Sequence, residues 1–201
     1  MLLIEQSKKR ISKGLSLIEA SMVLALSAIV VSGVLYYYNV ASNNRKLLED
    51  SKSIQMIIST VRSLYINQPQ GVDVDVNAVI KAGDFDSVQN GFYNYTGIKL
   101  PTGDAVYLYS GGTKHGGKMF SLELATYSQD VCTYISPLKL GSSHIGTEVI
   151  AQGASPIVTD FTAFMQEDDS VRFLTPDRAS EECATALDSG KFARVKMYMK
   201  D

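Results

Sequence analysis

The uncharged stretch from Ala20 to Asn44 constrains this chain more than any other feature of its sequence. Its 25 residues contain no Asp, Glu, Lys or Arg, and they are almost wholly apolar up to three consecutive tyrosines, Tyr36-Tyr37-Tyr38. A helix that spans a membrane needs about 20 apolar residues. Tyrosine rings favour the boundary between lipid and water. The stretch therefore predicts one membrane-spanning helix.

Charge is distributed unevenly around this stretch. Residues 1–14 contain four basic residues and one acidic residue, Glu5, so they carry a net charge of +3 and the rest of the chain carries −5. Because Lys and Arg are retained on the cytoplasmic side of a membrane, we expect the rest of the chain to face outward. The total charge of −2 offers no basic surface of the kind that binds nucleic acid, so no nucleic-acid partner is expected.

An ordinary secretory signal peptide is an alternative interpretation of the N-terminus. It would need an apolar core of about 7–15 residues, followed by a cleavage site with small residues. The apolar run here is longer, and the nearby candidate Asn39-Val40-Ala41 places asparagine where a small residue is needed. A small residue, Gly14, stands before the run instead.

Gly14 follows the basic tip and precedes Leu15-Ser16-Leu17-Ile18-Glu19. This arrangement resembles the processing signal of type IV prepilins, in which a prepilin peptidase cuts after the glycine and methylates the new N-terminal amine. The resemblance implies a leader peptide over residues 1–14, cleavage between Gly14 and Leu15, N-methylation of Leu15, and Glu19 at the fifth position of the mature chain.

The aliphatic Leu15 at the implied cut, together with the strings GLSLIEASMVLAL and YYYNVAS, resembles the type IVb pilins of the bundle-forming kind. The match covers residues 8–50, and beyond residue 66 it is one of layout only. It implies an α+β fold, the type IV pilin fold. In this fold a long N-terminal α-helix packs on an antiparallel β-sheet, with a disulfide-bounded C-terminal region.

Within this layout, residues 15–38 would form the transmembrane half of the helix, which becomes the filament core. Residues 39–201 would form the globular pilin domain. Apolar residues recur three and four apart over residues 45–66, which predicts an amphipathic second half of the helix. They are Ile54, Ile57, Ile58, Val61, Leu64 and Tyr65. The charged residues of this segment, Asp50 among them, are expected to lie largely off that apolar stripe.

Residues 72–110 are expected to form a connecting region with short elements, with turns signalled at residues 90–91 and 101–104. A helix is expected over residues 121–136. A second helix should begin at Thr175-Pro176-Asp177, with Thr175 as its N-cap, and end before Gly190. The expected strands are 105–109, 146–151, 156–165, 170–174 and 191–200.

Cys132 and Cys183 are the only cysteines in the chain. Two thiols in a domain outside the cytoplasm most simply form one disulfide, and two buried free thiols are the alternative. Closing the loop between them would add about 4 kcal/mol of stability.

Two motifs resemble ligand sites only in part. Gly112–Met119 is close to a nucleotide-binding loop, but Met119 stands where Ser or Thr is needed, so a glycine-rich surface loop is expected. Asp73–Asn77 begins like a calcium loop, but Ala78 and Asp84 depart from that pattern, so an acidic loop is expected. No cofactor, metal or catalytic site is expected.

Glu19 is a carboxylate inside an apolar segment, where a charge costs on the order of 2.5–3.5 kcal/mol at the bilayer centre and less near the interface. The resemblance implies a partner for it. In assembled pili this glutamate pairs with the N-terminal ammonium of a neighbouring subunit, here the amine of Leu15. The alternative is an idle charge at the lipid edge, modestly favoured by the helix dipole.

These features predict a structural protein rather than an enzyme: the major subunit of a type IVb pilus, used for adhesion or bundling. The implied partners are further copies of the chain, the prepilin peptidase, the assembly machinery of the inner membrane and a host cell surface. The chain would reside in the bacterial inner membrane and then in an extracellular filament. Two alternatives are a minor pilin or type II secretion pseudopilin, and a membrane-anchored enzyme or binding protein.

Overall fold

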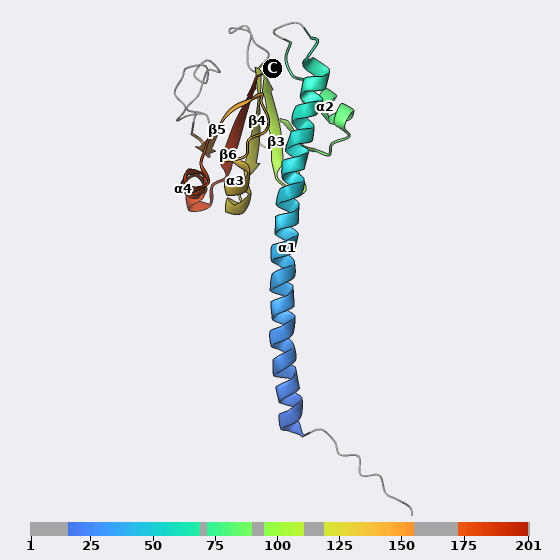
Figure 1. The fold of residues 1–201 in the computed structure, drawn as a ribbon, viewed down its shortest axis with the longest axis vertical. Helices are drawn as coiled ribbons and strands as arrows, with labels where there is room; N and C mark the ends of the chain where they lie inside the picture. The colour runs from blue at the N-terminus through green and yellow to red at the C-terminus, as the bar shows by residue number, and fades with distance from the viewer. Residues whose placement is uncertain (1–15, 69–71, 90–94, 111–118, 155–172, 201) are drawn as a thin grey trace, which may run out of the picture. The chain divides into compact units, whose positions relative to one another are not determined.

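The computed structural model describes residues 16–68, 72–89, 95–110, 119–154 and 173–200. Residue contacts divide the chain into two compact units, Met1–Ser42 and Asn43–Asp201. The elements, in chain order, are α1 (Leu17–Tyr65), α2 (Val76–Gly83), β1 (Ser87–Gln89), β2 (Thr96–Lys99), β3 (Ala105–Ser110), β4 (Met119–Thr126), α3 (Gln129–Ile135), β5 (His144–Ala151), α4 (Pro176–Leu187), the 3-10 turn η4 (Asp188–Gly190) and β6 (Ala193–Lys200) (Figure 1).

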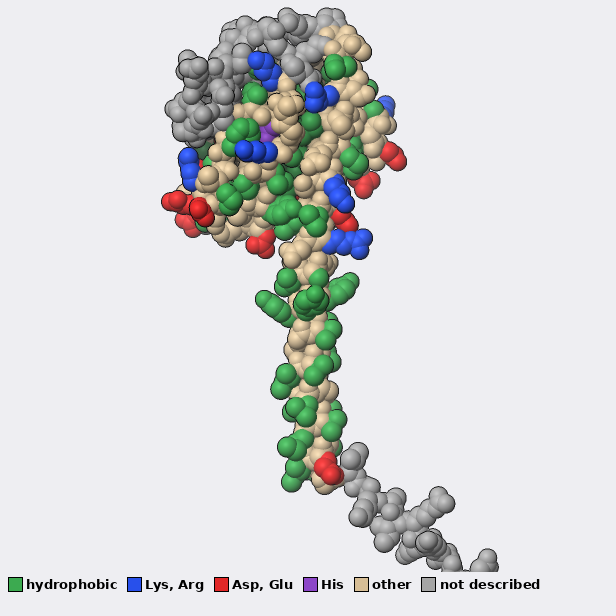
Figure 2. All heavy atoms as spheres, in the orientation of Figure 1, with side chains coloured by type: hydrophobic (Ala, Val, Ile, Leu, Met, Phe, Trp, Pro, Cys, Tyr) green, Lys and Arg blue, Asp and Glu red, His purple; other side chains and the backbone are tan. Residues whose placement is uncertain are grey.

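The part of α1 in the first unit is apolar on all sides. Its large apolar side chains are exposed, from Leu17 at 89% to Val40 at 42%, and Figure 2 shows them along this part of the helix. In the described part of the chain, α1 is the one helix long and apolar enough to cross a membrane. A helix of this kind is stable only when lipid or other helices surround it.

Six antiparallel strands form one sheet in the second unit, in the order β1-β2-β3-β4-β6-β5. The last strand of the chain, β6, lies between β4 and β5, so the C-terminal segment is inserted inside the sheet rather than added at its side. The strands predicted at 105–109, 146–151 and 191–200 are confirmed as β3, β5 and β6.

The second half of α1 contributes one side of the hydrophobic core, as predicted from its apolar spacing. Ile54, Ile57, Ile58 and Val61 are at most 5% exposed and cluster with residues of the sheet. The sheet contributes Ile98, Val106, Phe120, Leu122, Leu124, Val195, Met197 and Met199. Fully burying one such aliphatic side chain stabilises a fold by about 1.5–3 kcal/mol. Four of them therefore hold this segment of α1 firmly on the sheet.

The prediction of a helix over residues 121–136 is wrong for its first half. Residues up to Thr126 form strand β4, and α3 begins only after Ser128, whose hydroxyl caps it by accepting from the amide of Val131. Seven of the eight side chains of β4 are buried, so both of its faces are covered. The sequence Phe120-Ser121-Leu122-Glu123-Leu124 nevertheless alternates apolar and polar residues. Such alternation is typical of a strand, so the helix prediction overlooked a signal that the sequence contains.

The segment between α1 and β1 contains a short helix, α2, that the sequence analysis did not predict. Asp75 is its N-cap and accepts a hydrogen bond from the amide of Asn77 at 2.9 Å, while Asp84 ends it in the left-handed region with φ of 52°. Most of the stretch that begins like a calcium loop is thus a capped helix. The carboxylate of Asp75 is used for capping.

Three other expectations have mixed outcomes. The turn at 101–104 is confirmed, with Gly103 at φ +99°, a conformation that favours glycine. The helix start at Thr175 is confirmed, although the Thr175 side chain makes no capping hydrogen bond. The strand expected at 170–174 is absent at residues 173 and 174. The strand expected at 156–165, the turn at 90–91 and most of the glycine-rich segment 112–119 lie outside the described residues.

Candidate assembly site

The first turn of α1 holds Glu19, the residue predicted to act in assembly. The Ser16 amide donates to Glu19 Oε2 at 2.9 Å, and the Glu19 amide donates to the Ser16 hydroxyl at 3.2 Å. The Ser16 carbonyl accepts the first helical hydrogen bond, from Ala20 at 3.0 Å. Gly14 and Leu15, the predicted processing residues, lie outside the described part of the chain.

This reciprocal pair is a capping box, in which a serine and a glutamate three residues later satisfy each other's backbone amides. Glu19 therefore has a local structural role that the sequence analysis did not identify, although the Ser16-x-x-Glu19 spacing could have revealed it. The Glu19 side chain remains exposed. A carboxylate has about four acceptor positions, so capping leaves Glu19 able to accept hydrogen bonds from a cation of another molecule.

A broad apolar surface follows Glu19. It extends along α1 to the three tyrosines, which are 74%, 76% and 68% exposed. A contiguous exposed apolar surface of this kind marks an interaction with lipid or protein. The predicted filament-core segment thus presents its side chains for contact with other molecules.

The predicted disulfide is confirmed: Cys132 of α3 and Cys183 of α4 are bonded, with their Cα atoms 5.9 Å apart. Both cysteines are fully buried, and the Ser136 hydroxyl lies 3.9 Å from Cys183 Sγ. The bond joins two helices through cysteines that are 51 positions apart in the sequence. It therefore fixes α4 against α3 and limits how far this region can open.

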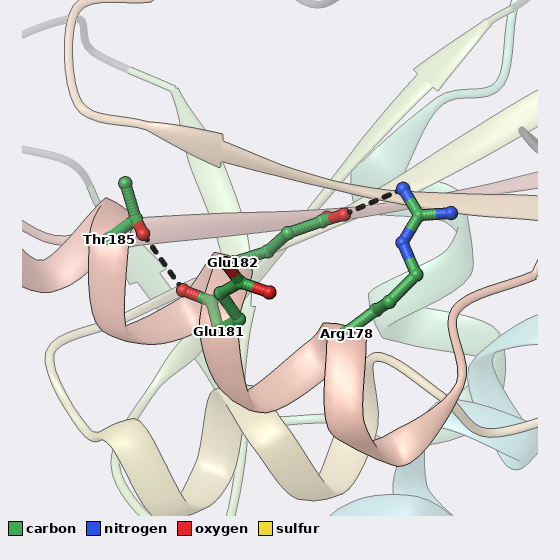
Figure 3. Close-up of polar contacts among 4 residues, drawn as sticks. All are labelled: Arg178, Glu181, Glu182 and Thr185. Atoms are coloured by element: carbon green, nitrogen blue, oxygen red, sulfur yellow. Dashed lines mark hydrogen bonds and ion pairs between the residues drawn. The ribbon is translucent and has the colours of Figure 1, made fainter.

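Helix α4 carries several polar side chains, four of which are drawn in Figure 3. Arg178 forms an ion pair with Glu182 at 3.2 Å, and the Thr185 hydroxyl donates to the backbone carbonyl of Glu181 at 2.9 Å. Asp177 and Glu181 are exposed on the same helix. Figure 2 shows acidic side chains gathered over this element.

Two acidic side chains meet at the hydroxyl of Thr102, a cluster that the sequence did not indicate. Asp50 on α1 accepts from the Thr102 amide at 3.1 Å and from its hydroxyl at 2.7 Å, and Asp104 lies 3.2 Å from the same hydroxyl. Thr126 also donates to Asp104, at 3.0 Å. Asp50 is fully buried, so the expectation that it lies off the packed side of α1 is wrong.

Burial raises the pKa of both Asp50 and Asp104, because an ionised carboxylate loses its hydration there. The hydrogen bonds from Thr102 act in the opposite direction, and the charge of Asp104 raises the pKa of Asp50 further. A groove of about 350 Å³ borders this cluster. Its lining residues are Asn43, Lys46, Leu47, Thr102, Asp104, Tyr127, Ser128, Asp130 and Val131.

The face of the sheet turned away from α1 carries a second polar network. The Tyr198 hydroxyl on β6 donates to Glu148 on β5, and Arg194 Nη1 lies 3.6 Å from Glu123 on β4. Lys196 Nζ lies 5.2 Å from the centre of the Tyr198 ring. Burial raises the pKa of Glu123, and the nearby Arg194 opposes that rise. The network joins three adjacent strands.

Among the residues that the structure describes, no three His, Cys, Asp or Glu side chains gather in a way that could hold a metal ion. The polar clusters instead connect α1 to a turn and strands to one another. Exposed features of the described residues include the apolar half of α1 with its capped glutamate and the acidic residues of α4. Their chemistry suits contacts with lipid and protein.

Comparison with known proteins gives one matching family and two curated relatives. A family profile described as Bundlin matches residues 39–197. The major structural subunit of the bundle-forming pilus from Escherichia coli O127:H6 is 29% identical over 197 residues, which are 96% of this chain and 96% of that protein. The protein of the same description from Escherichia coli O111:H- is 28% identical over the same shares of both chains.

Among solved structures, a type IVb pilin from Salmonella typhi covers 75% of this chain and 95% of its own length, with a TM-score of 0.49 and 12% identity. The Bundlin profile alone covers well over half of the chain and nearly all of the second unit. The expected membership of the bundle-forming pilins is thereby confirmed, largely by residues beyond those that carry the N-terminal resemblance. This chain belongs to the Bundlin family.

Proposed function

We propose that this chain is the major structural subunit of a type IVb pilus of the bundle-forming kind. One observation carries the proposal. A globular unit of the Bundlin family follows directly on a helix whose apolar side chains are exposed on all sides. Such a helix requires lipid before assembly and other helices after it. A subunit that moves from a membrane into a filament meets both requirements.

The chain would first be processed in the inner membrane. The basic tip holds residues 1–14 in the cytoplasm, where a prepilin peptidase cuts between Gly14 and Leu15 and methylates the new amine. Cleavage places a cation four residues before Glu19. The capping box keeps the Glu19 carboxylate in the first turn of α1 with acceptor positions to spare, which supports a pairing with the Leu15 ammonium of a neighbouring subunit.

The globular unit would remain outside the membrane, held by α1, until the assembly machinery moves the subunit into the filament. In the extracellular pilus the apolar half of α1 packs against other copies, and the globular units form the outer surface. That surface is what a host cell or a neighbouring pilus would contact. The descriptions of both curated relatives favour a major subunit over a minor pilin or a pseudopilin.

Expression in a strain that has a complete type IVb assembly system but lacks its own major subunit tests this proposal. We expect electron microscopy to show surface filaments, and this chain to be the most abundant protein in the sheared fraction. The matched control, Gly14→Val, should accumulate as precursor in the membrane and yield no filaments. Wild-type chain that is processed yet stays in the membrane, or that is a trace component of filaments, would contradict a major structural role.

A further inference from the structure

The second unit presents two charged helix surfaces that the fold itself does not use. The α1 stripe consists of Leu48, Lys52 and Met56, which are four residues apart and therefore lie on one side of the helix. The α4 stripe consists of Asp177, Glu181 and Ala184 on α4, spaced four and three residues apart, together with Asp188, the first residue of η4, which directly follows the helix. Every member of both stripes is exposed.

The α1 stripe combines a cation with apolar surface. Leu48 and Met56 are 55% and 52% exposed, and Lys52 stands between them without an anionic partner in the described residues. The adjacent Arg45 is already paired with Glu49 at 2.8 Å. A helix surface with an unpaired cation between two large apolar side chains is suited to a partner that is acidic and locally flat.

The α4 stripe has the complementary properties. Its three carboxylates form no ion pair in the described part of the chain. The one arginine of this helix, Arg178, is paired with Glu182 (Figure 3). Ala184 lies among these carboxylates, and a leucine or methionine of another molecule could pack against its small side chain. The disulfide from Cys183 to Cys132 fixes the backbone of this helix, so the stripe is presented rigidly.

We propose that the α4 stripe of one copy binds the α1 stripe of a second copy in the filament. Opposite charges on the two stripes give the contact its orientation, and Leu48 and Met56 supply buried apolar area beside Ala184. The inference rests on the proposed function, since it names the contact between globular units in the same polymer.

The two stripes are different surfaces of one chain, so their contact is heterologous. Each copy would use its α4 stripe toward one neighbour and its α1 stripe toward another. A heterologous contact whose rotation does not close a ring generates an open helical filament. The proposed contact therefore accounts for a polymer of the globular units as well as of the apolar helices.

Charge reversal tests the contact in assembling cells. Lys52→Glu alone, and Asp177→Lys with Glu181→Lys, should each lower the yield of sheared filaments about tenfold, because like charges then face each other across the contact. All three changes in one chain should restore the yield to within about twofold of wild type. Full yield from either single-stripe variant, or no restoration in the combination, would overturn the proposal.

Matched controls separate this outcome from a general effect of charge or folding. Lys81→Glu and Asp86→Lys reverse exposed charges on and after α2 and should leave the yield unchanged. Each variant must also reach the wild-type amount of processed, disulfide-bonded chain in the membrane. If wild-type chain forms no filaments, the proposed function fails. If filaments form and the reversals have no effect, only this contact fails.

Carbodiimide cross-linking of wild-type filaments supplies a second measurement that needs no variant. The reagent couples amines to carboxylates that are in contact. We expect mass spectrometry to find Lys52 joined to Asp177, Glu181 or Asp188 in filaments and not in membrane-held subunits. Filaments that cross-link through other lysines but never through Lys52 would contradict the proposed contact.

Discussion

The amide of Ser16 donates to the Glu19 carboxylate at 2.9 Å while the amide of Glu19 donates to the Ser16 hydroxyl at 3.2 Å. One glutamate thus has two tasks, because the oxygen that caps α1 belongs to the carboxylate proposed to meet a neighbour's amine. Capping needs only a hydrogen-bond acceptor, whereas pairing with an ammonium needs a negative charge. Substitutions can therefore separate the two tasks.

Glu19→Gln should keep the cap and abolish efficient assembly. Glutamine serves in a capping box as glutamate does, so the helix start is preserved and only the charge is lost. We expect processed subunit in the membrane and a severe loss of sheared filaments. Ser16→Ala, the matched control, weakens the cap by about 1 kcal/mol but keeps the charge, and it should still assemble. Wild-type filament yield from Glu19→Gln would refute the role of the charge.

Removing the disulfide should destabilise the globular unit by about 2–5 kcal/mol. We expect Cys132→Ser to lower the midpoint of thermal unfolding of the full chain in detergent and to change its mobility in a non-reducing gel. Cys183→Ser should have the same effect. Because the two residues form one bond, the double variant should be no less stable than the worse single variant. Additive losses would show that the cysteines act independently.

His144 should make the globular unit less stable in mild acid. Its Nδ1 accepts from the Leu140 amide at 3.2 Å, so a proton cannot be added there without breaking that bond. Burial lowers the pKa of His144 to about 4. The unfolded chain therefore takes up a proton first, and stability falls as the pH drops from about 6.5 toward 4, by up to about 3 kcal/mol in total.

Urea unfolding of the full chain in detergent at several pH values measures this dependence. His144→Asn offers an acceptor near the same place without a titrating ring, so it should flatten the curve between pH 6.5 and 4 even if its stability at pH 7 is lower. An unchanged slope in this variant would assign the acid sensitivity to other groups.

The Asp50 and Asp104 pair should act in the opposite direction. Burial raises the pKa of both groups in the folded state, so the ionised pair opposes folding at neutral pH. Their contribution is most favourable below the unfolded pKa of about 3.8 and diminishes as the pH rises through the folded values. Glu49, Lys46 and Asp130 are the other charged groups near this pair.

Asp104→Asn removes one of the two like charges and keeps an oxygen that can accept from Thr126. We expect the free energy of unfolding at pH 7 to be at least that of wild type, and its decline with rising pH to be smaller. Lys81→Ala, far from this pair in the sequence and exposed, is the control for a general change of charge. A variant that is clearly less stable at pH 7 would show that the Asp104 charge supports the fold.

Both halves of α1 could be predicted. The apolar surface of the first half and the one-sided packing of the second half each depend on residues that are close in the sequence. The uncharged run predicted an all-round apolar helix, and Ile54, Ile57 and Val61 predicted the packed side. Strand β4 was predictable too, because apolar and polar residues alternate from Phe120 to Leu124, but the helix prediction overlooked that alternation. The burial of Asp50 depends on Thr102, which is 52 residues away in the sequence. The Ser16-x-x-Glu19 spacing predicts the capping box, but the sequence analysis did not identify it.

The intact mass of the subunit recovered from sheared surface filaments tests the proposed processing and assembly together. We predict that the filaments consist mainly of this chain, that it begins at Leu15 with one added methyl group, and that it contains one disulfide. A filament fraction without this chain, or a chain that still carries residues 1–14, would contradict this prediction.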